Sequence, residues 1–424
     1  MGPIFGLCLS SKYRVHQMQS STDGKIRRTL PQLSGIAAVI LVGLAAGAVA
    51  QSFGRFTFGV LLPAIRDDLG LSNTVAGSLV TLNVAAYLVG TLIVATASSR
   101  YRLMTVMRLG MVLAVVGLLT AALSTGPLVL AAGLVLMGVG GSFTWIPAPI
   151  VAAAALGPER RGIAVGFVLS AMGAGVVFSG QLAGFVRSSM GDASWRSVYV
   201  VQSVIGIMVV GAALLFLSYS GDRPSAKSGF GGFSVLRRMP GWLPMTVMYA
   251  TFGLMYLLVV AFLTTRLEDD SGWTSTQASL AFTLLGVAMI FGGPLFNAIA
   301  AKVGPRLSLV LGFSAWAATT TIILPGRLLP ALAGAVAVGL LFSGLPTVIM
   351  AYVVVNTTTE DYGPSFAAAT FAFGVAQMIS PQIGGSIADA AGSFTPVFLL
   401  SAGLALVGVA AALRLPRTLR PTRA

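Results

Sequence analysis

The sequence predicts an all-α membrane protein in which twelve transmembrane helices form two pseudo-symmetric six-helix bundles. Composition is the first reason. Of the 424 residues 56% are hydrophobic and 9% are charged, and the mean hydropathy is +0.90, whereas soluble domains carry about 25% charge. The second reason is that apolar segments long enough to cross a bilayer recur along the whole chain. The third is an internal repeat that divides these segments into two sets of six.

The apolar segments are separated by short turns rich in glycine and proline, the residues that most often interrupt helices. A hydrocarbon core about 30 Å thick requires roughly 20 residues of helix, and the segments meet that requirement. The predicted spans are 36–62, 73–97, 104–124, 127–155, 163–187, 197–219, 241–264, 275–300, 308–325, 328–354, 365–388 and 395–414.

Polar stretches divide the chain into five parts. Residues 1–34 form a basic cytoplasmic tail without the apolar region of a cleaved signal peptide. Within this tail, Met18 is an alternative start to Met1, and the sequence leaves both open. The remaining parts are a bundle at 35–219, a cytoplasmic central loop at 220–240, a bundle at 241–415 and a cytoplasmic tail at 416–424.

Lysine and arginine are distributed unevenly between the two sides of the predicted membrane. With the amino terminus inside, the inner segments hold 20 of the 26 basic residues and the outer loops hold 5, with Arg55 as the remaining one. By the positive-inside rule both termini are cytoplasmic. The net charge of +14 is therefore an orientation signal, and no nucleic-acid partner is expected.

The two halves share short motifs at a nearly constant spacing. Asp67-Asp-Leu-Gly-Leu-Ser-Asn-Thr-Val-Ala76 matches Asp269-Asp-Ser-Gly-Trp-Thr-Ser-Thr-Gln-Ala278 at an offset of 202 residues, and Ser179-Gly-Gln-Leu-Ala-Gly184 matches Ser380-Pro-Gln-Ile-Gly-Gly385 at 201. Ser72 and Thr274 occupy equivalent positions, where a hydroxyl would cap the next helix. The simpler alternative is chance repetition of loop chemistry. A duplicated half predicts a two-bundle transporter with its site between the halves.

With this organisation the chain resembles the major facilitator superfamily of secondary transporters over about residues 35–415. Gly54-Arg-Phe-Thr-Phe-Gly-Val-Leu-Leu-Pro63, Leu69-Gly-Leu-Ser72, Ala76-Gly77 and the pair Asn83 and Tyr87 are similar to its bacterial YbfB/YjiJ-like branch. The resemblance implies the fold of that superfamily, a small-molecule substrate and a place in the plasma membrane, the bacterial inner membrane. The fifth span lacks the Gly-Pro pair typical of antiporters, which argues against proton antiport.

Arg55 is the one charge that lies well inside a predicted span. With Pro63 as the end of that span, Arg55 lies roughly 12 Å deep at about 1.5 Å of helix rise per residue. A buried membrane arginine is a functional-site hypothesis by default, and its guanidinium matches a carboxylate in two hydrogen bonds. The alternatives are that it snorkels to the surface or bonds backbone carbonyls at a helix junction. All twelve acidic residues lie in tails, loops or span ends, so none is expected beside it.

Other polar and aromatic residues inside the spans are candidates to line a shared cavity. Gln51 lies one helical turn from Arg55, and Asn83 and Tyr87 share a face of the second span by the same spacing. The predicted substrate-binding residues are Arg55, Gln51, Asn83, Tyr87, Trp145, Gln181, Tyr256 and Gln377. Bonds between helices account for the polar residues equally well, and packing more often accounts for the aromatic ones.

These features predict a secondary active transporter that moves a small organic solute by alternating access. Because the repeat mate of Arg55 is Leu257, a monocarboxylate or another small anion or zwitterion fits better than a dianion. Multidrug or metabolite efflux is the alternative, for which a carboxylate inside the membrane would be expected.

A membrane-embedded enzyme is a remote alternative, because His16 and Cys8, the only histidine and cysteine, both lie in the amino-terminal tail. No cofactor or metal is expected. Any proton coupling would use the solute's own carboxyl group or residues at loop ends. The expected partners are the lipid bilayer and the solute, with the chain acting as a monomer.

Overall fold

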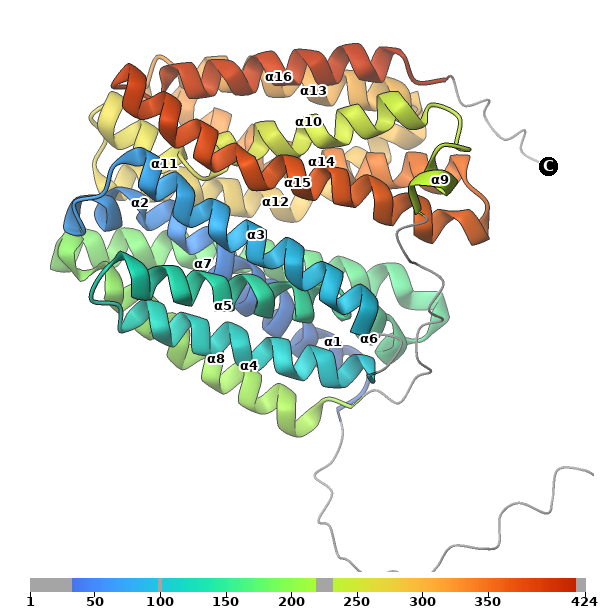
Figure 1. Cartoon of the computed structure of the whole chain (residues 1–424), viewed down its shortest axis with the longest axis horizontal. Coiled ribbons are helices and arrows are strands. Elements are labelled where there is room, and N and C mark those ends of the chain that lie inside the picture. Colours follow the sequence, from blue (N-terminus) through green and yellow to red (C-terminus); the bar gives the residue numbers. More distant parts are fainter. Residues whose placement is uncertain (1–32, 98–100, 219–231, 417–424) are drawn as a thin grey trace, which may run out of the picture.

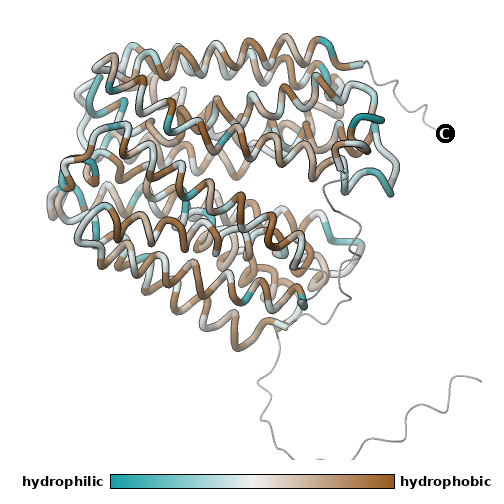
Figure 2. The backbone as a smooth tube through the Cα atoms, viewed as in Figure 1, coloured by the Kyte–Doolittle hydropathy of each residue, from teal (hydrophilic) through white to brown (hydrophobic). Residues whose placement is uncertain are grey.

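The computed structural model describes residues 33–97, 101–218 and 232–416, and these residues form helices joined by short turns. Twelve of the helical segments are long and apolar enough to cross a membrane, which confirms the predicted number of spans. Hydrophobic residues run along the helices and most hydrophilic residues gather at their ends (Figure 2). The predicted amino-terminal tail with Cys8, His16 and Met18, and most of the predicted central loop, lie outside the described residues.

The six spans of the first half are the blue-to-green elements of Figure 1. They are α1 (Gly35–Gly43), the π-helix η1 (Leu44–Phe56) and α2 (Thr57–Asp68) as one continuous span, then α3 (Asn73–Ala97), α4 (Leu103–Ala122), α5 (Pro127–Trp145) with α6 (Ala148–Leu156), α7 (Arg161–Met190) and α8 (Arg196–Phe216).

The second half, yellow to red in Figure 1, packs against the first. Its elements are the short α9 (Gly232–Leu236), α10 (Trp242–Val260), α11 (Leu263–Thr265), the short π-helix η4 (Arg266–Asp270), α12 (Ser275–Val303), α13 (Pro305–Ile323), α14 (Leu328–Asn356), α15 (Thr359–Ala391) and α16 (Thr395–Leu413). The main contacts between the halves are those of α7 with α12 and of α3 with α15, and α2 also packs on α11.

The first span does not end at Pro63, and that expectation was wrong. The helix continues through Pro63 to Asp68. Proline has no N–H to donate to the carbonyl four residues earlier, which is that of Gly59. The hydroxyl of Thr264, from the opposite half, donates to that carbonyl at 2.7 Å. Arg55 is therefore 13 residues from the end of its span, or about 20 Å deep at 1.5 Å per residue.

Equivalent residues in the two halves make equivalent contacts, which supports the predicted repeat. Thr274 caps α12 with a capping box, and Ser72 Oγ accepts a hydrogen bond from Val75 N at 3.2 Å. A Cβ added to Gly138 would lie 2.3 Å from a backbone carbonyl oxygen of the second span. Gly339 lies 201 residues later, and a Cβ added there would lie 2.2 Å from a backbone carbonyl oxygen of the eighth span. Both glycines thus allow the same close approach of two helices.

Two ion pairs join the halves at one end of the molecule, which we call the closed end. Arg187 and Glu268 form two parallel hydrogen bonds of 2.7 Å each, and Arg66 pairs with Asp269. Arg66 and Glu268 are 202 residues apart, so the repeat places opposite charges at equivalent positions. The described ends of the chain lie at the other end of the bundles (Figure 1).

Candidate functional site

The segment that carries Arg55 is a π-helix, η1, rather than the α-helix that its apolar pattern predicts. In a π-helix each N–H bonds the carbonyl five residues earlier, and such turns are frequent at functional sites. The hydroxyl of Ser52 repeats the five-residue spacing, because it donates to Gly47 O at 3.0 Å. It also lies 2.5 Å from Met172 O of α7. The wider turn keeps Gln51 and Arg55 on neighbouring parts of one face.

The guanidinium of Arg55 lies at the boundary between the halves. Its Nη2 donates a hydrogen bond to Gln377 Oε1 of α15 at 3.2 Å, and the Tyr256 hydroxyl of α10 donates to the same oxygen at 2.6 Å. The guanidinium carbon lies 4.7 Å from the centre of the Tyr87 ring, a cation–π contact. Among the described residues no carboxylate forms an ion pair with Arg55.

Gln51 brings a buried hydrogen-bond donor to the site. The residue is 3% exposed and its amide group lies beside Tyr87, but among the described residues its nitrogen Nε2 has no hydrogen-bond partner of good geometry. Buried polar groups are normally paired, and an unpaired one costs about 1–3 kcal/mol. Together with Arg55, Gln51 therefore offers donors to an acceptor that the protein itself does not provide.

Asn83 holds the backbone of the site in position. Its amide nitrogen donates to Gly54 O at 3.1 Å and to Leu134 O at 2.7 Å, so it joins three spans of the first half immediately before Arg55. The side chain is 3% exposed. Asn83 therefore fixes the place of Arg55 through its bond to the preceding carbonyl.

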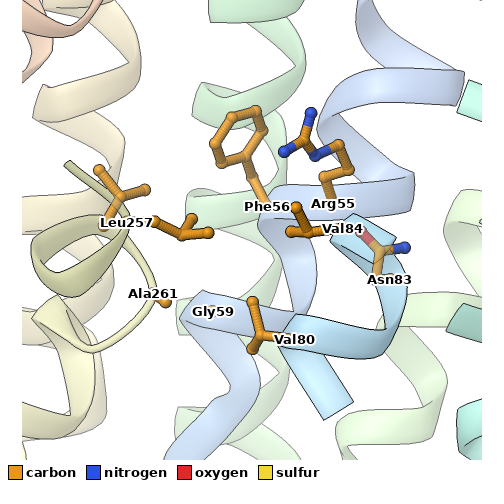
Figure 3. Close-up of a pocket in the computed structure, with 9 residues that line it drawn as sticks. Arg55, Phe56, Gly59, Val80, Asn83, Val84, Leu257 and Ala261 are labelled. Atoms are coloured by element: carbon orange, nitrogen blue, oxygen red, sulfur yellow. The ribbon is translucent and has the colours of Figure 1, made fainter. Parts of the chain in front are cut away.

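A cavity of about 20 Å³ lies beside Arg55, with room for about one water molecule. Figure 3 shows Leu257 and Ala261 of the second half facing Phe56, Val80 and Val84 of the first. The repeat mates Arg55 and Leu257 thus line one space between the halves. The lining residues are Arg55, Phe56, Gly59, Val80, Asn83, Val84, Leu257, Val260 and Ala261.

Comparison with known proteins identifies the group to which this architecture belongs. Residues 47–413 match the model of a family described as the uncharacterised MFS-type transporter YbfB. The chain belongs to this family.

A curated relative of this MFS-type chain is AraJ, a candidate transporter of Escherichia coli (strain K12). It is 25% identical over 278 residues, which cover 65% of this chain and 68% of AraJ. Membership of the family and the fold support a secondary transporter.

Solved structures share the fold at low sequence identity. One is a mutant of the nucleoside transporter NupG, with a TM-score of 0.72, 12% identity and coverage of 89% of this chain and 98% of that one. Another is a bacterial homologue of the human lysosomal transporter Spinster, in an inward-facing and occupied conformation, with a TM-score of 0.65 and 15% identity over 89% and 94% of the two chains. These similarities establish the arrangement of helices that the sequence predicts.

Two of the predicted residues, Gln181 and Trp145, make no hydrogen bond or ring contact with Arg55 among the described residues. Gln181 lies where the halves meet, and its Nε2 donates to Thr283 Oγ1 of α12 at 3.2 Å. Trp145 is the last residue of α5. It lies one turn after Gly141, and a Cβ added to Gly141 would lie 3.5 Å from the Tyr87 ring. Neither lines the small cavity. The other six, Arg55, Gln51, Asn83, Tyr87, Tyr256 and Gln377, are linked by contacts with Arg55 or with its immediate neighbours.

Sequence reasoning missed other residues of functional interest. Arg187 was expected in an outer loop, yet its side chain is 1% exposed and bonds both Glu268 and Asp192. Gln202 forms a buried polar cluster with Thr57 and Ser179. Its Nε2 donates to Thr57 Oγ1 at 2.9 Å and to Ser179 Oγ at 3.0 Å. Spacing within one helix cannot reveal either residue, because all of these partners lie on other elements.

Proposed function

We propose that the protein is a secondary active transporter that binds a small organic monoanion at Arg55 and moves it across the membrane by alternating access. The observation that carries the proposal is that, within the described part of the chain, the Arg55 guanidinium has no carboxylate partner and the Nε2 of Gln51 has no hydrogen-bond acceptor. A carboxylate of the solute would accept from both groups. Charge-assisted hydrogen bonds of this kind are stronger than neutral ones.

The second half supports a monoanion rather than a dianion. Its contribution to the site consists of Gln377, Tyr256 and the apolar Leu257, Val260 and Ala261, none of which carries a charge. A second negative charge would therefore be buried without a counter-ion, which costs several kcal/mol or more.

The ion pairs of the closed end support alternating access, because they join the halves at one end of the molecule only. The pairs Arg187–Glu268 and Arg66–Asp269 join the halves there. By the positive-inside rule this end faces away from the cytoplasm and both termini are cytoplasmic. In this orientation, the conformation is closed toward the outside, and a bacterial protein of this kind would lie in the inner membrane. Rocking of the halves would break these pairs and open the site to the outside.

A transport and binding experiment with Arg55→Ala tests this proposal. Purified protein is screened by thermal shift against monocarboxylic acids, amines and sugars, and ligands found are tested for uptake into proteoliposomes. Loss of charge-assisted bonds worth about 1.5–3 kcal/mol lowers affinity for the acids by about 10- to 100-fold.

Arg327→Ala removes an exposed arginine at the start of α14 and serves as the control, with binding unchanged. Arg55→Lys retains the charge but loses the fork geometry, so it recovers part of the affinity. Normal uptake of the anion by Arg55→Ala would contradict the proposal.

A further inference from the structure

The rings around Arg55 form an aromatic box, which we define as Phe56, Tyr87, Tyr256, Phe342 and Phe373. Phe342 of α14 meets Phe56 edge-on at 5.7 Å and Tyr256 at 5.2 Å between ring centres. Phe373 of α15 lies 6.0 Å from Tyr256 at an interplanar angle of 11°. Tyr87 lies against the guanidinium itself. Five helical segments from both halves thus contribute rings: four of the rings contact one another in series, and the fifth, Tyr87, contacts the guanidinium.

The ring of Phe373 belongs to a longer series that leads away from the site. Along α15, Tyr362, Phe366, Phe373 and Gln377 fall on one face by their spacing. Tyr249 of α10 stacks on Phe373 at 4.7 Å and on Phe366 at 6.4 Å, and Phe366 stacks on Tyr362 at 5.8 Å. The interplanar angles in this series are 25° or less. The series runs toward the end of the bundles that carries the described chain ends.

Four members of the site retain partial exposure although they lie in the middle of their spans. Arg55, Tyr87, Phe342 and Phe373 are each half-buried, whereas Tyr256 and Phe56 are buried. Aromatic rings attract one another through offset or edge-on contacts with centres about 4.5–7 Å apart. The half-buried rings therefore retain surface with which a further ring could make such contacts.

We infer that the preferred solute is an aromatic monocarboxylate, whose carboxylate binds Arg55 and whose ring packs in the aromatic box. This inference rests on the proposed function and specifies its substrate class. The carboxylate replaces the Gln377 oxygen as the partner of Arg55. The solute ring lies parallel to Phe373 or edge-on to Phe342. A sugar acid is disfavoured, because it carries more hydroxyls than the few polar side chains of the site can pair, and the rest would lie against rings, leucine and valine.

The experiment compares acids that differ only in aromaticity. Benzoate is paired with cyclohexanecarboxylate, and 3-phenylpropionate with 3-cyclohexylpropionate, and affinities are measured by calorimetry on the full-length protein in nanodiscs. Aromatic contacts favour the aromatic member of each pair by about three- to tenfold, the range for one or two ring pairs. Benzylamine, which has the ring but the opposite charge, does not bind.

Variants of α15 test whether the preference for aromatic acids depends on the aromatic box. Phe373→Leu is expected to lower the affinity for the aromatic acids several-fold and to leave the cyclohexyl acids unchanged. Phe371→Leu is the matched control, because its ring, two residues away, packs against Phe233 instead. Phe373→Tyr keeps a ring and keeps the preference. Thermal unfolding and gel filtration verify that each variant is folded.

The outcomes separate this inference from the proposed function. Equal affinity for aromatic and cyclohexyl acids, with both lost in Arg55→Ala, would overturn the aromatic preference and leave the anion site in place. Binding of both classes that survives Arg55→Ala would overturn the proposed function. A panel in which no acid binds would refute the inference, as would a preference retained in Phe373→Leu.

Discussion

Arg55 and Arg187 are both arginines of the first half that reach across to the second, yet they have opposite surroundings. Arg187 is almost fully buried, and its guanidinium bonds the carboxylates of Glu268 and Asp192. Arg55 is half-buried deep in its span and meets an amide oxygen and a ring. A charge whose partners are all protein groups stabilises one conformation. A charge that lacks a counter-ion is available to a ligand, so the difference leads us to propose gating for Arg187 and binding for Arg55.

The largest expected effect that tests this comparison is on stability. Arg187→Ala leaves Glu268 buried without its partner, and breaking a buried pair in this way costs about 3–5 kcal/mol. Arg55→Met, in contrast, removes an unpaired charge and leaves the unfolding temperature unchanged or higher. Thermal unfolding in detergent measures both.

A double variant isolates the pairing energy. Arg187→Ala with Glu268→Ala removes both charges and is expected to recover much of the loss. Arg66→Ala is a matched control at the same end, because its pair with Asp269 is more exposed and is worth about 0.2–1 kcal/mol. If Arg187→Ala were no more destabilising than Arg66→Ala, the gating role of Arg187 would be contradicted.

An intermediate effect is expected at Pro63 and Thr264, where the second half completes the first span. Thr264→Val leaves the Gly59 carbonyl without a donor, at a cost of about 1–2 kcal/mol. Pro63→Ala restores a backbone N–H that reaches the same carbonyl. The cost of Thr264→Val should therefore be smaller in the Pro63→Ala background, which a double-mutant cycle by thermal unfolding measures. Equal costs in both backgrounds would show that this bond does not compensate for the proline.

The smallest expected effect is a pH dependence of the closed end. Burial raises the pKa of the Glu268 carboxyl above its ordinary value even though Arg187 opposes this shift; Asp192 and Asp269 raise it further. When the halves separate, water reaches Glu268 and its pKa returns toward the ordinary value. The closed conformation then binds the proton more tightly, so a fall in pH from the raised pKa toward the ordinary glutamate value favours the closed conformation.

Distances across the closed end measure this shift. Spin labels at Val75→Cys and Thr276→Cys, two exposed positions on opposite halves, report the closed fraction in a Cys8→Ser background. Glu268→Gln removes the titrating group and serves as the control. A closed fraction that falls with decreasing pH, or the same pH response in Glu268→Gln, would contradict the assignment.

The sequence predicted much of this arrangement because a membrane restricts what a chain can do. Length and apolarity were sufficient for the twelve spans, and the 202-residue spacing was sufficient for the two related halves. At the site, Arg55, Gln51, Asn83 and Tyr87 could be associated because two sequence-local pairs, each four residues apart, lie on adjacent spans. Tyr256 and Gln377 were named as candidates, but their bond to each other and to Arg55 joins positions up to 322 residues apart.

The sequence by itself thus determined the class of fold, the repeat and the one cation well inside a predicted span, because hydrophobicity and charge are properties of the residues themselves. Only the tertiary structure decided which groups that cation meets, how far its helix continues and that Arg187 is buried. Thr264, Gln377 and Glu268 all act across the boundary between the halves. A hydrogen bond or an ion pair requires two groups at one place, and that place is created by the packing of distant helices.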